Sequence, residues 1–174
     1  GLAAALALAG CAAEPSMPST PTVASEPNVS GQAPASPRDV VTGLAAPWSV
    51  VRVGDSALVS ERDAARILEF TPGGSIREVA AIAGVVTGGE GGLLGLAVSP
   101  DERALYVYST AASGNRVERY VLEGAAGALS LAAPETIIDG LPMAGVHNGG
   151  RPAVGPGGSP FNLFFLHIPR PPHS

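Results

Sequence analysis

Cysteine, lysine and long apolar runs are scarce or absent in this sequence. Their scarcity argues against a disulfide-bonded fold, a nucleic-acid-binding protein and a membrane-spanning helix. Cys11 is the one cysteine among 174 residues, so no intramolecular disulfide can form. Lysine is absent, and 10 arginines against 15 acidic residues give a net charge of −5. This balance argues against a nucleic-acid partner, because phosphate contacts need a basic face. The apolar run at residues 1–10 is far shorter than the roughly 20 residues of a membrane-spanning helix.

Charged side chains and helical patterns are also scarce. Charged residues make up 14% of the chain and aromatic residues 5%, whereas there are 23 glycines and 17 prolines. No segment keeps a helical period over three turns. Residues 125–133 are rich in alanine, but Gly127 interrupts them and Pro134 follows. The composition therefore predicts an all-β fold of many short strands joined by turns.

Short β-prone runs separated by turn formers begin after residue 39. Turns are expected at Gly54-Asp55, at residues 71–74 and at residues 99–101, where glycine, proline and aspartate cluster. Between the turns the sequence predicts strands at residues 40–43, 49–53, 57–60, 66–70, 75–80, 93–98, 105–109, 116–122 and 135–138.

The pattern of strands and turns repeats along the chain. Residues 51–55 followed by 57–60 align with residues 97–101 followed by 104–109, and a third copy begins at residues 153–157. The spacing is about fifty residues, which is the period of a four-stranded propeller blade. The repeat therefore predicts a β-propeller. A β-sandwich with irregular loops is the competing fold, but it does not account for turn residues that repeat together with the strands.

The N-terminal residues carry signals of export. Residues 8–11 (LAGC) end an apolar run of the signal-peptide type and resemble a bacterial lipobox, which implies cleavage before Cys11 and lipids on its thiol and new amino group. An ordinary secretory signal with a chance cysteine is the alternative. We interpret residues 1–11 as a signal-peptide remnant and residues 12–38 as a disordered tether rich in proline, serine and alanine. The expected location is extracytoplasmic, with a lipid anchor in the bacterial cell membrane.

Three loop segments carry most of the side chains suited to chemistry. They are residues 60–63, the glycine-rich residues 88–95 and residues 147–151 (HNGGR), and each precedes or opens a repeat unit. Equivalent loops of successive propeller blades converge on one face around the central channel, so we expect Glu90 and His147 to come together. A histidine has an ordinary pKa near about 6.5 and can exchange a proton at neutral pH. The glycine-rich segment is no phosphate loop, because it lacks the Gly-Lys-Ser/Thr ending.

Several motifs occur in a fixed order: Pro47-Trp48, residues 58–63, residues 89–97, residues 99–101, residues 105–108, residues 115–117 with Arg119-Tyr120, and residues 147–151. Together they resemble the N-terminal part of the soluble glucose/sorbosone dehydrogenase family, the PQQ-dependent aldose sugar dehydrogenases. The resemblance runs from about residue 41 to residue 155. The family is a six-bladed β-propeller, which implies that about the first two blades and the start of a third lie in this chain.

The resemblance implies pyrroloquinoline quinone (PQQ) and Ca²⁺ as cofactors, and oxidation of the anomeric hydroxyl of aldose sugars, with an external electron acceptor. His147 matches the family's general base. Glu90 stands where the family places a polar residue near cofactor or sugar, and a solvated loop carboxylate is the alternative. Asn148 either orients the imidazole or caps a turn. Arg151 pairs either with an anionic group of the cofactor or with a carboxylate of the protein, because guanidinium forks suit carboxylates.

Other residues of these motifs have structural interpretations. Trp48 is expected between blades, in the core. Glu61, Arg62 and Asp63 predict a structural turn network, and Asn115 with the following arginine predicts a turn at the start of a strand.

The family pattern weakens after Arg151. Pro152 occupies a strand position, where it removes a hydrogen-bond donor, and Gly157 stands where an aspartate is expected. We interpret residues 39–158 as a partial propeller and residues 159–174 as an aberrant tail, such as a frameshift or a truncation leaves.

The departure limits what the chain is expected to do alone. Most partners of the PQQ carboxylates and the Ca²⁺ ligands are expected outside it, and an open propeller leaves unpaired strand edges. The chain alone is therefore predicted to bind no PQQ, to be inactive and to aggregate or unfold. The alternatives to an enzyme are a non-enzymatic propeller lipoprotein that binds a glycan or a partner protein, and a degraded, inactive gene product.

Overall fold

The computed structural model describes Ser36, residues 39–155 and residues 160–163. The chain divides into two units, Gly1–Pro37 and Arg38–Ser174, and the strands described below belong to the second. The predictions for the lipobox at Cys11 and for the tether fall outside the described residues, apart from Ser36. No helix in the described part of the chain is long and apolar enough to cross a membrane.

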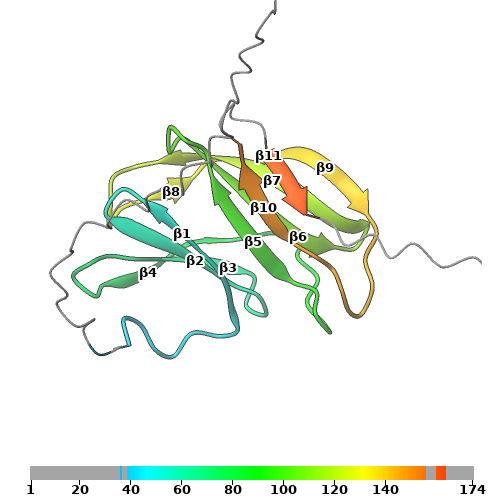
Figure 1. The fold of residues 1–174 in the computed structure, drawn as a ribbon, viewed down its shortest axis with the longest axis horizontal. Helices are drawn as coiled ribbons and strands as arrows, with labels where there is room; N and C mark the ends of the chain where they lie inside the picture. Colours follow the sequence, from blue (N-terminus) through cyan, green and yellow to red (C-terminus); the bar gives the residue numbers. More distant parts are fainter. Residues whose placement is uncertain (1–35, 37–38, 156–159, 164–174) are drawn as a thin grey trace, which may run out of the picture. The chain divides into compact units, whose positions relative to one another are not determined.

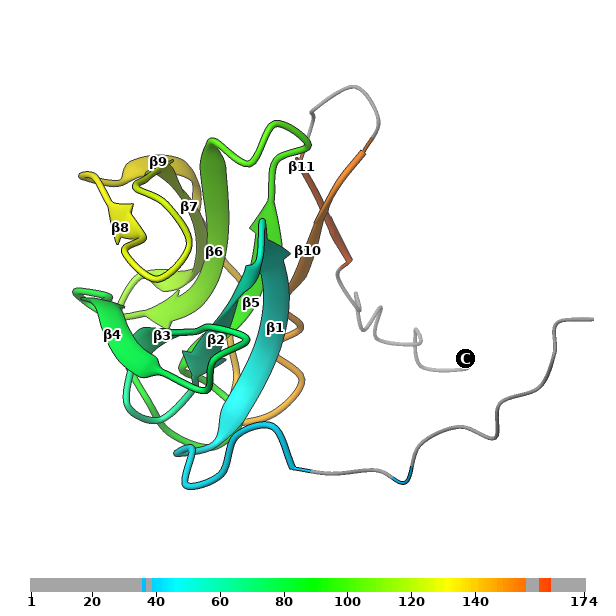
Figure 2. The same ribbon diagram turned by 90° about the vertical axis from the view of Figure 1, so that its left-hand side faces the viewer.

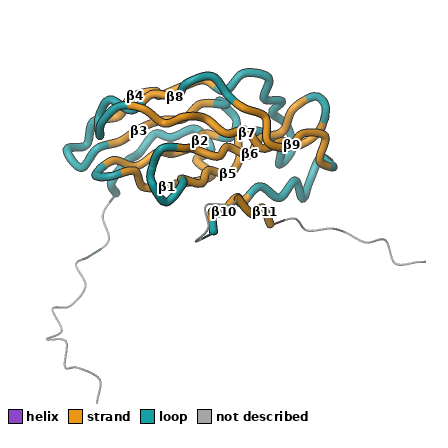
Figure 3. Tube along the Cα trace, turned by 90° about the horizontal axis from the view of Figure 1, so that it is seen from above, coloured by secondary structure: helices purple, strands orange, loops and turns teal. Residues whose placement is uncertain are grey.

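The regular structure consists of strands, and no helix occurs in residues 39–155 or 160–163 (Figure 3). The first sheet is an antiparallel meander in the order β1-β2-β3-β4 (Figure 1). Its first hairpin has the expected two-residue turn: Val53 pairs with Ser56, and Gly54 between them has a φ of 53°. The strands are β1 (Pro47–Val53), β2 (Ser56–Glu61), β3 (Arg66–Phe70) and β4 (Ile76–Ala81).

The second sheet repeats this meander. Strands β5, β6 and β7 pair in order, and β7 then pairs with β8 and β9 along different parts of its length. Strands β10 and β11 form a separate antiparallel pair. The strands are β5 (Leu93–Val98), β6 (Ala104–Ala111), β7 (Gly114–Glu123), β8 (Ser130–Leu131), β9 (Glu135–Leu141), β10 (Arg151–Val154) and β11 (Pro160–Leu163).

The first strands of the three sheets are neighbours, because β5 packs against both β1 and β10 (Figure 2). Each sheet begins with one hairpin of the sequence repeat: β1–β2, β5–β6 and β10–β11. Meandering sheets whose first strands lie side by side are the blades of a β-propeller. The predicted fold is therefore confirmed, as two blades and the beginning of a third.

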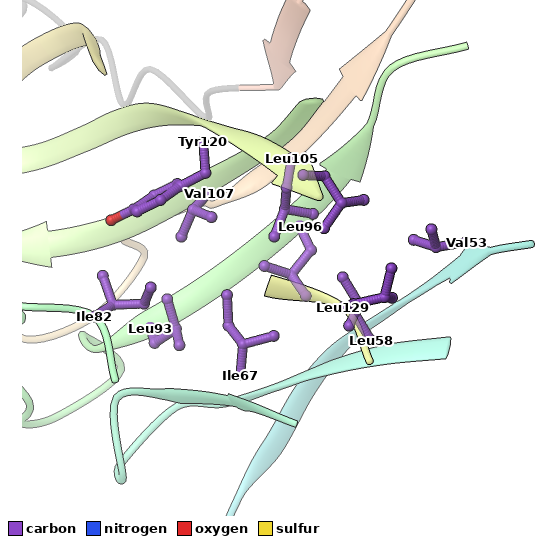
Figure 4. Packing of buried hydrophobic residues seen from close by; sticks show 11 residues of the cluster. Val53, Leu58, Ile67, Ile82, Leu93, Leu96, Leu105, Val107, Tyr120 and Leu129 are labelled. Atoms are coloured by element: carbon purple, nitrogen blue, oxygen red, sulfur yellow. The ribbon is translucent and has the colours of Figure 1, made fainter. Parts of the chain in front are cut away.

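A hydrophobic cluster joins the first two blades (Figure 4). The first blade contributes Leu58 and Ile67, and the second contributes Leu93, Leu105 and Val107; all five side chains are fully buried. Burying an aliphatic side chain of this size stabilises a fold by about 1.5–3 kcal/mol. The two blades consequently share one core.

A second cluster lies on the opposite side of β5. Leu94 and Ala97 of β5 belong to it, whereas Leu93 belongs to the first cluster, so β5 is buried on both faces. Trp48 of β1 and Val154 of β10 pack against this second cluster. The interpretation of Trp48 as a core residue between blades is confirmed.

Gly95 marks the closest approach between β5 and the third sheet. It lies in an irregular stretch of pairing between Leu93 and Leu96. A Cβ atom added at Gly95 would collide with the Gly150 carbonyl oxygen and with Cδ of Pro152. A glycine inside a strand is typical of such close backbone approaches.

Gly95→Ala should push β10 away from β5 and lower the free energy of unfolding by about 3 kcal/mol, the upper end for overpacked sites, because backbone atoms cannot yield. The test is a urea titration of the complete gene product followed by tryptophan fluorescence. Gly73→Ala is the matched control, since its nearest contact is an ordinary 3.8 Å. Equal midpoints for the two variants would contradict the prediction.

A buried carboxylate fastens the second blade to the first. The Glu69 side chain of β3 is fully buried and accepts hydrogen bonds from the Gly127 N–H at 2.6 Å and the Leu129 N–H at 3.1 Å, both from the loop before β8. Arg77 of β4 pairs with the same carboxylate at 2.5 Å and donates to the Gly127 carbonyl at 3.0 Å. We call Glu69 and Arg77 with this loop the blade latch.

Two expectations from the sequence differ from the structure. Residues 40–43 form no strand: Val40 is 70% exposed, Gly43 has a φ of 75°, and no strand pairs with the segment. Within the predicted aberrant tail, Pro160–Leu163 forms β11 and pairs with β10. Pro152 is accommodated inside β10, opposite Asn162. These four residues therefore form a strand, while the aberrant tail at residues 159–174 stays a prediction.

Candidate functional site

Two loops from successive blades meet at the candidate site. The His147 loop, residues 142–150, joins β9 to β10, and the glycine-rich loop, residues 88–92, precedes β5. The Glu90 N–H donates to the Gly145 carbonyl at 2.9 Å, and the His147 N–H donates to Oε2 of Glu90 at 2.6 Å. The expected meeting of Glu90 and His147 is thus confirmed across 57 residues of sequence.

His147 has an uncommon backbone conformation. Its φ is 61°, and Gly149 and Gly150 that follow have φ values of 70° and 105°. A residue with a side chain holds such a conformation at a cost of roughly 1–3 kcal/mol, and residues of this kind cluster at functional sites. His147 is exposed, whereas the neighbouring Asn148 is buried. The loop therefore presents the histidine to solvent and keeps the next side chain inside.

The turn between β2 and β3 contributes an ion-pair network near the site. Arg62 pairs with Asp63 at 2.7 Å. This hydrogen bond, together with the charges of Asp63 and, to a smaller extent, Glu90, raises the pKa of Arg62. Glu61 is fully buried and pairs with Arg66, whose hydrogen bond lowers the pKa of the Glu61 carboxyl. The predicted turn network of residues 61–63 is confirmed.

A buried network that the sequence interpretation missed supports the His147 loop. The Tyr108 hydroxyl donates to the Asn148 carbonyl at 2.7 Å, and burial raises the pKa of Tyr108 to about 12, so the phenol remains a donor at neutral pH. Asn115 Nδ2 donates to the Pro142 carbonyl at 2.7 Å. Asn115 is fully buried as the second residue of β7, so it belongs to the strand and not to the turn that was expected at the strand's start.

The predicted cofactor residues Asn148 and Arg151 have different surroundings. Asn148 Oδ1 accepts from the Ala144 N–H at 3.1 Å, and Nδ2 donates to the Ala144 carbonyl at 2.7 Å, so its side chain closes a turn within the loop. Turn capping, one of the two roles weighed from the sequence, fits these contacts, while its contact with a cofactor stays a prediction. Arg151 is exposed and forms no ion pair with another described residue, and its pairing with an anionic group of a cofactor stays a prediction.

Glu90→Ala should accelerate amide hydrogen exchange at His147, because the acceptor of that N–H is lost. An increase of about tenfold is expected, since one hydrogen bond contributes on the order of 1 kcal/mol. Glu90→Gln keeps an oxygen acceptor and should stay closer to the wild type. The exposed Glu123→Ala is the control. An equal exchange rate of the His147 amide in the wild type and in all three variants would refute the proposed role of the Glu90 carboxylate as its acceptor.

Comparison with known proteins identifies relatives of the chain. A family profile described as Glucose / Sorbosone dehydrogenase matches residues 44–165, ten residues beyond the C-terminal limit of the resemblance seen in the motifs. No curated protein matches the sequence.

Two solved structures resemble the fold at substantial sequence identity. The PQQ-bound form of aldose sugar dehydrogenase from Streptomyces coelicolor is 39% identical with a TM-score of 0.65, and the alignment covers 72% of this chain. A putative oxidoreductase (glucose dehydrogenase) from Thermus thermophilus is 35% identical with a TM-score of 0.62, over 73% of this chain. The matched region spans 39% of each of those proteins. Since the family profile covers most of the two blades and of the site loops, the chain belongs to the glucose/sorbosone dehydrogenase family.

Proposed function

We propose that this chain carries the general base of a PQQ-dependent dehydrogenase that oxidises the anomeric hydroxyl of aldose sugars. The observation that carries the proposal is the exposed His147, held in a left-handed conformation by a loop that Glu90 and a buried network fix on both sides. Membership of the sugar dehydrogenase family and the PQQ bound to the Streptomyces coelicolor relative support it.

The described residues fit part of a PQQ site. PQQ carries carboxylates, and Arg151 is an exposed guanidinium without an ion-pair partner among the described residues. Glu90 directs one carboxylate oxygen to the His147 backbone, which leaves its second oxygen for a sugar hydroxyl. The described residues contain no group of three or more His, Cys, Asp or Glu arranged to hold a metal ion. We propose that most ligands of the Ca²⁺ lie outside them.

In the proposed reaction the sugar loses a hydride from C1 and a proton from the anomeric hydroxyl, and becomes a lactone. PQQ, when bound, supplies the quinone that accepts the hydride. The role of His147 is to accept the hydroxyl proton, which a positioned histidine accelerates by about 10²–10⁴-fold. Glu90 and the residues behind the loop hold the backbone that carries the imidazole. The electrons pass finally to an external acceptor.

We also propose that the protein works outside the cytoplasm, attached to the bacterial cell membrane through lipids on Cys11. The apolar run and the LAGC motif support this location. The partners are then an aldose sugar, an electron acceptor and the lipid bilayer, with no nucleic acid. Metabolic labelling with an alkyne-tagged fatty acid should mark the wild type and not Cys11→Ser; equal labelling of both proteins would refute the anchor.

The test of the catalytic proposal is aldose-dependent dye reduction by the complete gene product supplied with PQQ and Ca²⁺. We expect reduction of the dye with at least one aldose, loss of the activity when PQQ is omitted, and lactone as the product. Sugar binding without oxidation across the aldose panel would instead favour the non-enzymatic glycan-binding lipoprotein. The same assay on the chain alone checks its predicted inactivity.

A further inference from the structure

Asn115 is a fully buried amide in the hydrogen-bonded core of the second blade. It lies on β7, paired with Thr110 of β6 on one side and with Leu141 of β9 on the other. A buried amide needs partners for its carbonyl oxygen and for its two N–H donors, because unpaired polar groups are costly in the interior. Its partners therefore reveal what the residue holds together.

Thr110 fixes the orientation of this amide. The Thr110 hydroxyl donates to Oδ1 of Asn115 at 2.7 Å, and Thr110 itself is buried. With Oδ1 occupied in this way, the Nδ2 group faces the His147 loop, where the nearby groups are acceptors. The amide consequently acts on that loop as a donor only.

Both ends of the segment around His147 depend on this donor. Asn115 Nδ2 donates to the Pro142 carbonyl at 2.7 Å and to Oδ1 of Asn148 at 3.3 Å. The Asn148 side chain in turn holds both backbone groups of Ala144. One buried amide thus ties residues 142, 144 and 148 together, and His147 lies within the segment that they enclose.

Two further contacts of the segment come from Glu90. Glu90 accepts from the His147 N–H and donates its own N–H to the Gly145 carbonyl. These two bonds fix the position of the backbone at residues 145 and 147, but Glu90 is exposed and in contact with solvent. On the buried side of the His147 loop, the hydrogen bonds come from Asn115 and from the Tyr108 hydroxyl.

We propose that Asn115 is a positioning residue for His147: through Pro142 and Asn148 it sets the place of the imidazole without touching it. This inference rests on the proposed function of His147 as a base. A proton acceptor must lie within hydrogen-bond reach of the hydroxyl, and a displacement of about 1 Å can lower a rate about a hundredfold. A relaxed loop therefore affects the chemical step more than it affects sugar binding.

Asn115→Asp is the sharpest variant, because it preserves shape and replaces the donor with a carboxylate oxygen that faces two acceptors. Thr110→Val is the second variant, nearly isosteric, and removes only the hydroxyl that orients the amide. Ser109→Ala is the matched control: Ser109 is equally buried in the same hairpin, but its hydroxyl accepts from Arg116 and has no bond to the His147 loop.

The first measurement is hydrogen exchange of the peptide covering residues 142–148 in the complete gene product. We expect exchange about tenfold faster in Asn115→Asp, a smaller increase in Thr110→Val and none in Ser109→Ala, since losing one bond of on the order of 1 kcal/mol changes an opening equilibrium about that much. Unchanged exchange in both Asn115→Asp and Thr110→Val would overturn the proposal. This readout does not depend on catalysis.

The second measurement is the kinetics of aldose oxidation in single and double variants. Asn115→Asp should lower kcat at least about tenfold with KM changed less than about twofold, and should have no further effect in a His147→Ala background, because residues acting through one group are not additive. An equal fall in kcat in both backgrounds would overturn the positioning role. If the wild type oxidises no aldose, the proposed function fails, and the exchange experiment alone still decides whether Asn115 holds the loop.

Discussion

His147→Ala should lower kcat for aldose oxidation by about 10²–10⁴-fold, the range that a positioned general base contributes, with a much smaller change in KM. The reason is that the imidazole is proposed to act on the hydroxyl proton during hydride transfer, while the rest of the sugar contacts remain. Stopped-flow reduction of a dye by the complete gene product, saturated with PQQ, measures this difference directly. No other single change at the site is expected to have so large an effect on the rate.

Two comparisons separate loss of the base from loss of the loop. Met143→Ala, at an exposed position of the same loop, should retain nearly full activity. Added imidazole should restore part of the rate of His147→Ala, because the side chain that was removed is exposed. Activity of His147→Ala within about threefold of the wild type, well short of the effect of a general base, would refute the role of His147.

Glu69→Ala should lower the free energy of unfolding by about 3 kcal/mol, because it leaves the N–H groups of Gly127 and Leu129 without their acceptor and removes the partner of the part-exposed Arg77. Glu69 accepts from Gly127 and Leu129 of the second blade and pairs with Arg77 of its own. The loss is a large part of the roughly 5–15 kcal/mol that stabilises a typical domain. Urea unfolding of the complete gene product measures it.

The blade latch also makes the free energy of unfolding depend on pH. Burial raises the pKa of the Glu69 carboxyl, but hydrogen bonds from Ser56, Gly127, Leu129 and Arg77 outweigh burial and leave the pKa below 4.5. Because the folded-state pKa is the lower one, this stabilisation is complete above pH 4.5 and is lost as the pH falls through the folded value. The stability difference between wild type and Glu69→Ala should therefore shrink in acid.

Glu78→Ala is the matched control for the latch. Glu78 lies on the adjacent strand, is half exposed and meets Arg66 only at 3.8 Å, so its removal should cost less than about 1 kcal/mol. Equal destabilisation by the two substitutions would mean that the latch does not fasten the blades.

The fold could be predicted because its signals are local and repeated. Eight of the nine expected strands occur, since alternating β-prone residues between Gly-Asp and Pro-Asp turns leave few other conformations. The strand predicted at residues 40–43 does not form, because no neighbouring strand pairs with this segment and a strand needs a hydrogen-bonded partner. The third repeat copy at residues 153–157 predicted the start of the β10–β11 pair only in part, because Pro152 suggested an interrupted strand, yet the ring of Pro152 fits against Gly95.

The site was only partly predictable. Glu90 and His147 could be brought together from the repeat alone, because equivalent loops of neighbouring blades converge. The roles of Gly95, Thr110 and Asn115 could not, because each depends on which backbone lies opposite, and the sequence does not contain that information directly.

The His147 loop has a consequence for how the protein is made. Its supports at Glu90, Tyr108 and Asn115 all precede it in the sequence. A chain synthesised from its N-terminus therefore already contains these anchors when the loop leaves the ribosome. The hydrogen bonds that hold this loop to Glu90, Tyr108 and Asn115 therefore need no residue that follows the loop in the sequence.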